Sequence, residues 1–283
     1  MNFKLNALVA AALLVAAGSA NAAISSAASG NGELMINFIS QGGTSATAGG
    51  DDMSAVFDLG VNMNAFLANK NQAGFTQTWS LSAANYGTAW SDLLAFSAND
   101  AAIEFNVIAL DNVNVRYLTT NNVATYTSLT NANLTGFQGM DPYVTVNNGR
   151  GNHATQANGA STALATDVAN SYFRAVNGAG QGDTWLTKTS DTTKTLATAQ
   201  NFWSLSVGAG NASAQADKSA FGFDINGNGS IGTGEFGKWS VDMAAGTVTF
   251  ANPVPEASTY GMMLAGLGLV GFMARRRMSS RTA

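Results

Sequence analysis

The class of the fold is set by one stretch of alternating residues, Phe75-Thr-Gln-Thr-Trp79-Ser-Leu81-Ser82. Phe75, Trp79 and Leu81 fall on one face of an extended chain, and the opposite face carries only threonine and serine. A period of two residues is typical of a β-strand. Because only one face is apolar, we expect this strand in an antiparallel sheet with one face in the core and one in water.

Strand patterns continue on both sides of this stretch. Toward the N-terminus, Glu33–Ile39 is apolar on both faces, and Gly60 separates two further apolar segments, 54–58 and 61–67. Toward the C-terminus, the alternating segments 103–107 and 113–117 flank a turn signal at Asp111-Asn112 and predict a hairpin. The remaining predicted strands are 125–129, 143–146, 201–207 and a closing hairpin formed by 238–243 and 247–251.

Two segments have a helical period instead. Trp90, Leu93 and Leu94 predict a short helix over residues 88–97. Apolar residues also recur at every fourth position from 164 to 176, with Ser161 available as the N-cap, and predict a second helix. The chain therefore predicts a mainly β fold, an antiparallel β-sandwich-like body at residues 23–253 with one or two short helices.

Composition and charge limit the partners of this body. The chain has no cysteine, so it can form neither disulfides nor a thiolate site. Residues 23–253 keep eight of the 13 basic residues and 16 of the 17 acidic ones, a net charge of −8 (8 − 16). The body is therefore a poor candidate for binding nucleic acid, and we expect no such partner, because phosphate contacts need lysine and arginine.

The N-terminus has the pattern of a secretory signal peptide at residues 1–22. Lys4 precedes an apolar stretch over residues 5–17, and the small residues Ala20 and Ala22 form an A-x-A cleavage site. The mature chain is therefore expected to start at Ala23.

The C-terminus has an apolar run followed by basic residues. The run from Tyr260 to Ala274 carries no charge, and Arg275, Arg276 and Arg277 come directly after it. As a helix the run spans about 22 Å, which is shorter than a hydrocarbon core of about 30 Å. Arginine side chains that reach the interface make up part of the difference. By the positive-inside rule the arginines stay in the cytoplasm, as does the 279–283 tail, and the body lies on the far side of the membrane.

This tail resembles the PEP-CTERM sorting signal of exopolysaccharide-producing Gram-negative bacteria. In that family a Pro-Glu-Pro motif precedes a short transmembrane helix and an arginine-rich end, and an exosortase, a membrane-embedded cysteine transpeptidase, cuts near the motif. The matching residues here are Val254, Pro255 and Glu256, and Ala257 replaces the second proline. The resemblance implies a sorting signal at residues 254–278 with its transmembrane helix at 260–274.

One segment, 224–235, fits the EF-hand calcium loop at its diagnostic positions. The oxygen ligands of that template would come from Asp224, Asn226, Asn228, Ser230 through its carbonyl, and Glu235, with Gly229 as the turn glycine. Glycines on both flanks argue against EF-hand helices. With two carboxylates, the loop predicts a weak structural Ca²⁺ site in a β context. An Asn-Gly turn without a metal is the alternative.

Signatures of catalysis are scarce. The chain has no Gly-x-Ser-x-Gly elbow and no His-Glu-x-x-His motif, and its sole histidine, His153, lies in a loop rich in Asn and Gly. We therefore expect a non-enzymatic protein that is exported across the inner membrane, anchored there transiently and then located at the cell surface or outside the cell. Its processing partners would be signal peptidase and exosortase.

The resemblance also implies an association with exopolysaccharide and the biofilm matrix. One alternative is a carbohydrate-binding module, which would use some of the five tryptophans, Trp79, Trp90, Trp185, Trp203 and Trp239. A second alternative is a polysaccharide hydrolase that would use two of the dispersed carboxylates.

Overall fold

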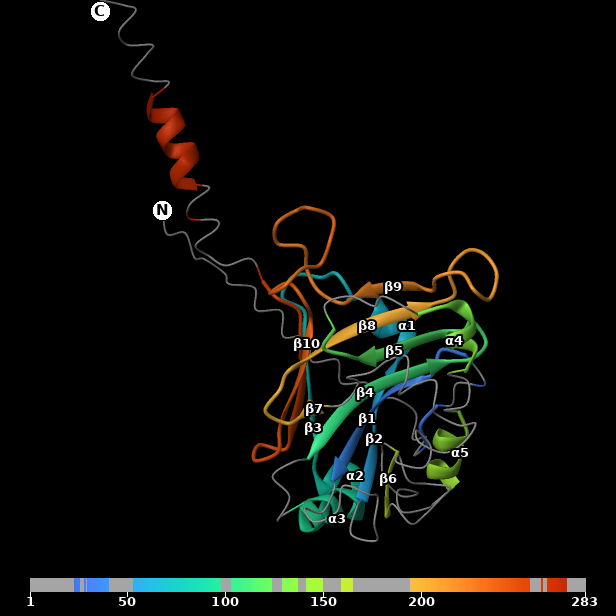
Figure 1. The fold of residues 1–283 in the computed structure, drawn as a ribbon. Helices are drawn as coiled ribbons and strands as arrows, with labels where there is room; N and C mark the ends of the chain where they lie inside the picture. Colours follow the sequence, from blue (N-terminus) through green and yellow to red (C-terminus); the bar gives the residue numbers. More distant parts are fainter. Residues whose placement is uncertain are drawn as a thin grey trace, which may run out of the picture.

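The computed structural model of this 283-residue chain describes residues 23–25, 28, 30–40, 53–97, 103–123, 129–136, 141–149, 159–164, 194–254, 261 and 264–273. These residues form a mainly β body with short helices on both sides of a curled sheet, and a separate C-terminal helix (Figure 1). The predicted class, mainly β and antiparallel, is confirmed.

Every strand pairing in the described part of the chain is antiparallel. The sheet order is β3-β11-β10-β8-β5-β4-β1-β2-β6, with β7 paired to β4 and β9 paired to β8. The strands are β1 Glu33–Ser40, β2 Met53–Asn62, β3 Thr76–Ser80, β4 Glu104–Asp111, β5 Arg116–Thr120, β6 Ala160–Leu164, β7 Lys194–Thr195, β8 Gln200–Ser206, β9 Asp217–Ala220, β10 Lys238–Asp242 and β11 Thr247–Ala251.

The sheet is continuous, and this differs from the expected sandwich. β10 pairs with β11 along five residues but with β8 through only two, Lys238 with Asn201 and Trp239 with Gln200. This short pairing links the β3–β11–β10 unit to the central strands in one curled sheet. A sequence pattern reports which face of each strand is buried, and two separate sheets or one curled sheet can bury the same faces.

The central strands are buried on both faces. In β1, Leu34, Ile36 and Phe38 pack in one apolar cluster, whereas Met35 and Ile39 pack in the other. This double burial explains why Glu33–Ile39 is apolar on both faces in the sequence. The strand of the opening stretch differs, because β3 exposes Thr76, Thr78 and Ser80 and turns its other face to the core.

The larger cluster lies inside the curl and is rich in aromatic rings. At its centre, Phe66 is 1% exposed and lies within 6.4 Å, centroid to centroid, of six other rings. These rings are Phe75, Trp79, Phe202, Phe221, Trp239 and Phe250. They come from strands far apart in sequence and from the segments flanking them, so this packing holds β3, β11 and β10 against the rest of the sheet.

Short helices fill the space around the sheet. They are α1 Met63–Leu67, α2 Ala83–Tyr86, α3 Thr88–Ser97, α4 Asn131–Gly136 and α5 Asp141–Gly149. The bounds of α3 are those that the sequence predicts. The Ser82 side chain caps α2 by accepting a hydrogen bond from Asn85 N.

Three sequence predictions about local structure are wrong. Ser161 begins no helix, because residues 160–164 form β6, which pairs with β2 and buries Ser161 and Ala163. Residues 143–146 belong to α5 rather than to a strand, and 63–67 form α1. Residues 124–128 and 165–193 lie outside the described part, as does most of the predicted second helix.

Gly60 does not separate two strands either. β2 runs through it with an irregularity in register, and the backbone there has φ of 63°. Gly60 N donates to the Asp58 carboxylate at 2.7 Å. A glycine adopts this left-handed conformation without steric cost, so it supports a β-bulge inside the strand.

Candidate functional site: the sorting junction and the acidic loop

The chain leaves the body through a junction that is held by the turn after α1. The Asn252 side chain is 4% exposed, and its Nδ2 donates to three backbone carbonyl oxygens at 3.0–3.2 Å. These carbonyls belong to Asn69, Lys70 and Gln72. The backbone is bound as well, because Gly74 N donates to Pro253 O at 3.0 Å. The folded body therefore extends to Pro253, directly before the predicted sorting motif.

Beyond this junction the described residues are exposed. Val254 is 60% exposed, and residues 264–273 form a helix that stands away from the body (Figure 1). The large apolar side chains on this helix are each more than half exposed; they are Leu264, Leu267, Leu269, Val270, Phe272 and Met273. No helix within the described residues is both long and apolar enough to cross a membrane.

Several predicted targeting residues lie outside the described part of the chain. These are Ala20 and Ala22 of the cleavage site, Pro255, Glu256 and Ala257 of the motif, and Arg275, Arg276 and Arg277. The predicted start of the mature chain is close to a fixed point, however. Ile24 is 2% exposed, and its backbone N and O both hydrogen-bond the Asn148 side chain, at 2.9 and 2.7 Å.

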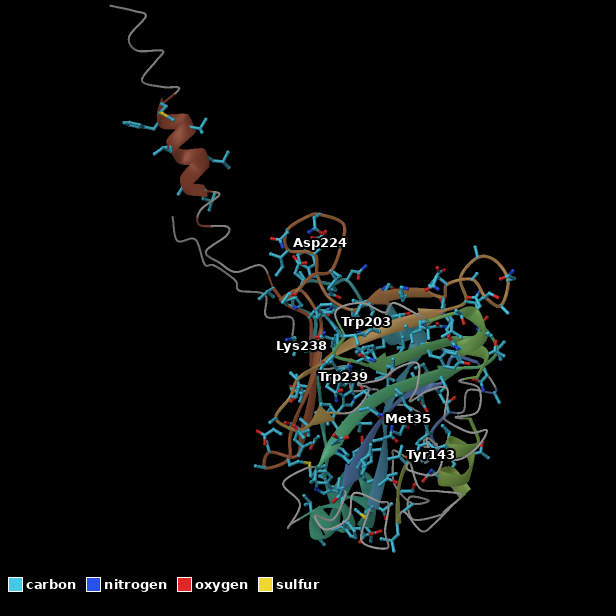
Figure 2. All side chains as sticks on the ribbon, in the orientation of Figure 1. Met35, Tyr143, Trp203, Asp224, Lys238 and Trp239 are labelled. Carbon is cyan, nitrogen blue, oxygen red and sulfur yellow. The ribbon has the colours of Figure 1, made fainter. Side chains whose placement is uncertain are left out.

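The acidic loop 224–235 projects from the body between two backbone contacts at its base (Figure 2). Phe223 N donates to Glu235 O at 3.0 Å, and Gly237 N donates to Phe221 O at 2.7 Å. The flanks are extended rather than helical, and β10 begins at Lys238. This agrees with the expectation that flanking glycines exclude EF-hand helices. Gly229, the predicted turn glycine, has φ of 81°.

Asp224 at the start of the loop accepts hydrogen bonds from the backbone. Its Oδ1 accepts from Asn228 N at 3.1 Å and its Oδ2 from Gly229 N at 2.6 Å. The Gly229 amide, and after it the Asn228 amide, lowers the pKa of Asp224, because each hydrogen bond favours the charged carboxylate. Asp224 is therefore ionised and holds the turn.

Glu235 at the end of the loop is buried and fully engaged. It is 3% exposed, and its Oε1 accepts from Ile225 N, Asn226 N and Asn226 Nδ2 at 2.7–3.1 Å. Its Oε2 accepts from Gly232 N at 2.7 Å. Four donors match the hydrogen-bonding capacity of a carboxylate, so the loop is closed by its own backbone.

The loop offers oxygen donors of the kind that calcium prefers. Two ionisable carboxylates, two Asn side chains and the Ser230 carbonyl stand in one twelve-residue turn. No group of three or more His, Cys, Asp and Glu side chains among the described residues could hold a metal, so amide and carbonyl oxygens would have to complete the ligand set. A bound cation would also replace some of the hydrogen bonds to Glu235.

The tryptophans in the described part of the chain do not form an exposed platform. Trp239 is 0% exposed, Trp90 and Trp203 are each 6% exposed, and Trp79 is half-buried with its Nε1 donating to Leu59 O at 2.8 Å. Trp185 lies outside the described residues. Three of the four described tryptophans are core residues and Trp79 packs against the core, so these four form no exposed stacking surface for sugars.

A second acidic feature is buried near the start of β1. Asp58 is 2% exposed, and burial raises its pKa to about 8, with the charge of Glu33 adding to the rise. Burial raises the pKa of Glu33 too, against a hydrogen bond from Ser25 N at 2.6 Å. Asp58 is out of reach of a polymer, so this pair does not supply the carboxylates of a hydrolase.

The fold and the junction define a class, a mainly β body with a separate C-terminal sorting tail. Residues 253–277 match the family model of the PEP-CTERM protein-sorting motif. The chain therefore carries a PEP-CTERM signal, as predicted, and is consistent with an exosortase substrate that is exported, processed at the membrane and then located at the surface. Comparison of the chain with curated proteins and with solved structures gives no match.

Proposed function

We propose that this protein is a non-enzymatic component of the cell surface or extracellular matrix that associates with exopolysaccharide in a biofilm. In this proposal, signal peptidase cuts after Ala22, the 260–274 helix holds the chain in the inner membrane, and exosortase removes the tail near Pro255. The observation that carries the proposal is the PEP-CTERM motif at residues 253–277.

The structure of the junction supports this order of events. Asn252 and Pro253 are hydrogen-bonded to the body, and the apolar side chains of the 264–273 helix have no contact with it that would bury them. Such a helix gains free energy by entering a bilayer, because about 25 cal/mol is recovered for each Å² of apolar surface removed from water. The tail can therefore occupy the membrane while the body stays folded outside it.

The test is an intact mass of the protein recovered from the cell surface and from the medium of its native host. We expect a species that starts at Ala23 and ends near Pro255, with added mass where glycans are attached. A surface species that still carries Arg275–Arg277 would show a plain membrane anchor and would contradict processing by exosortase. Recovery from the cytoplasm alone would contradict export.

We also propose that the acidic loop binds Ca²⁺ as a structural ion that fixes the start of the closing hairpin. The support is the set of oxygen donors at the template positions, together with the left-handed turn at Gly229. A ligand that binds only the folded state raises its stability by mass action. With two carboxylates, the expected dissociation constant is about 0.1–1 mM.

Calcium binding is tested by thermal unfolding of the purified chain in Ca²⁺, in Mg²⁺ and in chelator. We expect Ca²⁺ to raise the Tm of the wild type and not that of Glu235→Gln. Asp242→Asn is the matched control, because Asp242 is an exposed acid in the β10–β11 hairpin. An unchanged wild-type Tm at 10-fold the expected dissociation constant would leave the loop as an Asn-Gly turn without a metal.

A further inference from the structure

A cavity of about 650 Å³ lies beside the acidic loop, at the edge strand β9. Its walls come from three places: the turn after α1, the β8–β9 pair and the loop 224–235. The residues that matter for its chemistry are Lys70, Trp203, Lys218, Ser219, Phe223 and Asp224. Small-molecule sites usually have volumes of about 300–1,000 Å³, so this cavity has the size of a ligand site.

Two ammonium groups line this one cavity. The body has eight basic residues and a net charge of −8, yet Lys70 and Lys218 both lie here. Neither forms an ion pair within the described part of the chain, where Arg116 and Asp111 make the only one, at 2.5 Å. The Lys70 ammonium instead donates to the Ser219 hydroxyl, which ties the turn after α1 to β9.

The single carboxylate in the cavity wall, that of Asp224, makes no ion pair with either lysine. Asp224 spends both oxygens on the backbone amides of Asn228 and Gly229. Lys70 is half-buried, and burial lowers its pKa, so its charged form is under-solvated. An anion that enters the cavity would find two positive charges and the one negative charge of Asp224, and the net attraction is stronger in a partly buried site than in water.

The remaining lining is mixed, with apolar and hydroxyl or amide groups side by side. Trp203 is 6% exposed and packs on Phe236 with ring centroids 5.6 Å apart, so it forms a floor rather than a stacking platform. Phe223 and Ile231 add apolar wall, whereas Asn71, Ser219 and Ser230 add polar groups. Sugars present apolar faces and hydroxyl edges, and this lining suits both.

We propose that this cavity binds a carboxylate-bearing sugar unit of an acidic polysaccharide, with Lys70 and Lys218 contacting the carboxylate. The polysaccharide source of this ligand rests on the matrix association proposed above. The lysines select acidic over neutral sugars, because a neutral sugar brings no negative charge to pair with either ammonium group. The acidic loop forms one wall, so it shapes the cavity as well as the hairpin.

The test uses the purified full-length chain in mild detergent and isothermal titration with trigalacturonic acid, with galactotriose as the neutral probe. We expect the wild type to bind the acid and not the neutral sugar. Lys70→Gln and Lys218→Gln should each weaken binding by about tenfold, because each removes one charged hydrogen bond. Lys70→Arg keeps the charge and should retain binding.

Lys238→Gln is the matched control, because Lys238 is an exposed lysine on β10 that does not line this cavity. It should bind trigalacturonic acid as the wild type does, and circular dichroism should show all variants folded. No binding by the folded wild type, equal binding of the neutral sugar, or equal weakening by Lys238→Gln would each overturn the proposal.

These outcomes are independent of sorting. The intact mass of Lys70→Gln and Lys218→Gln chains recovered from the host reports export and cleavage, which the cavity does not control. Correct processing with no binding would overturn the cavity proposal alone. Binding in vitro with no export would overturn the matrix proposal alone.

Discussion

The buried carboxyl of Asp58 makes the stability of this protein depend on pH in a defined direction. Its pKa is 3.8 in a solvated chain and about 8 in the fold, where burial disfavours the charged form and Glu33 adds repulsion. A group whose pKa is raised on folding contributes its stability fully below the unfolded pKa. That contribution is lost as pH rises toward the folded pKa. The protein should therefore be less stable at pH 7 than at pH 5.

The size of the effect follows from the same two values. Between pH 3.8 and pH about 8, the free energy of unfolding falls by about 1.4 kcal/mol for each pH unit. The step from pH 5 to pH 7 therefore costs about 2–3 kcal/mol. For a domain of this size, that is a fall in Tm of about 5–10 °C. The Gly60 and Gly159 amides, which donate to Asp58, act in the opposite direction and are already included in the value of about 8.

Asp58→Asn isolates this contribution, because asparagine imitates the neutral acid in shape. The assay is thermal unfolding by circular dichroism at pH 5, 6, 7 and 8 for the wild type and the variant. The variant should lack most of the pH slope and overtake the wild type toward pH 8. Glu33→Gln should reduce the slope in part, since it removes the neighbouring charge. Parallel pH profiles for the wild type and Asp58→Asn would refute the reasoning.

Three further predictions concern packing and the hairpins. Phe66→Ala should lower the free energy of unfolding by about 3–5 kcal/mol, because it leaves a cavity among six rings, and urea unfolding measures this loss. Gly60→Ala should lower the free energy of unfolding by about 1–2 kcal/mol by the same method, since φ of 63° strains any residue with a Cβ. As a control, Ala65→Gly on the exposed side of α1 should lower it by about 1 kcal/mol or less. Asp111 should make the fold acid-sensitive. Hydrogen bonds from Asn114 and Arg116 outweigh its burial and hold its pKa at about 2, so its stabilising contribution is lost as pH falls from 3.8 toward 2, and Asp111→Asn should flatten the unfolding profile in that window.

Patterns that depend on near neighbours predicted the structure well. The period of two in 75–82, the hairpin across Asp111-Asn112, the closing hairpin and the helix at 88–97 all appear in the structure. In each case the strand or helix is decided by which side chains share a face, and a single sequence displays that directly. The PEP-CTERM signal is local in the same sense.

Predictions failed where a distant partner decides. Ser161 is predicted to cap a helix whose apolar repeat starts at Leu164, yet β2 would otherwise present an unpaired edge, and pairing with it draws residues 160–164 into β6. Residues 143–146 look like a strand, but the Tyr143 hydroxyl reaches the buried Asn37 side chain at 2.9 Å from α5. Both outcomes depend on contacts more than one hundred residues away in sequence.

The candidate sites show the same contrast: the sorting motif and the acidic loop are contiguous in the sequence, whereas the cavity at β9 is not. The sequence by itself determined the sorting motif and supplied the predicted signal peptide and the oxygen donors of the acidic loop, because each is a contiguous pattern whose physics is set by adjacent residues. Only the tertiary structure brought Lys70 and Lys218, 148 positions apart, to one cavity, placed Trp203 in its wall and closed Glu235 within its own loop. A cavity exists only where the sheet curls and its edge strand meets a distant turn, and this juxtaposition has no local signature in the chain.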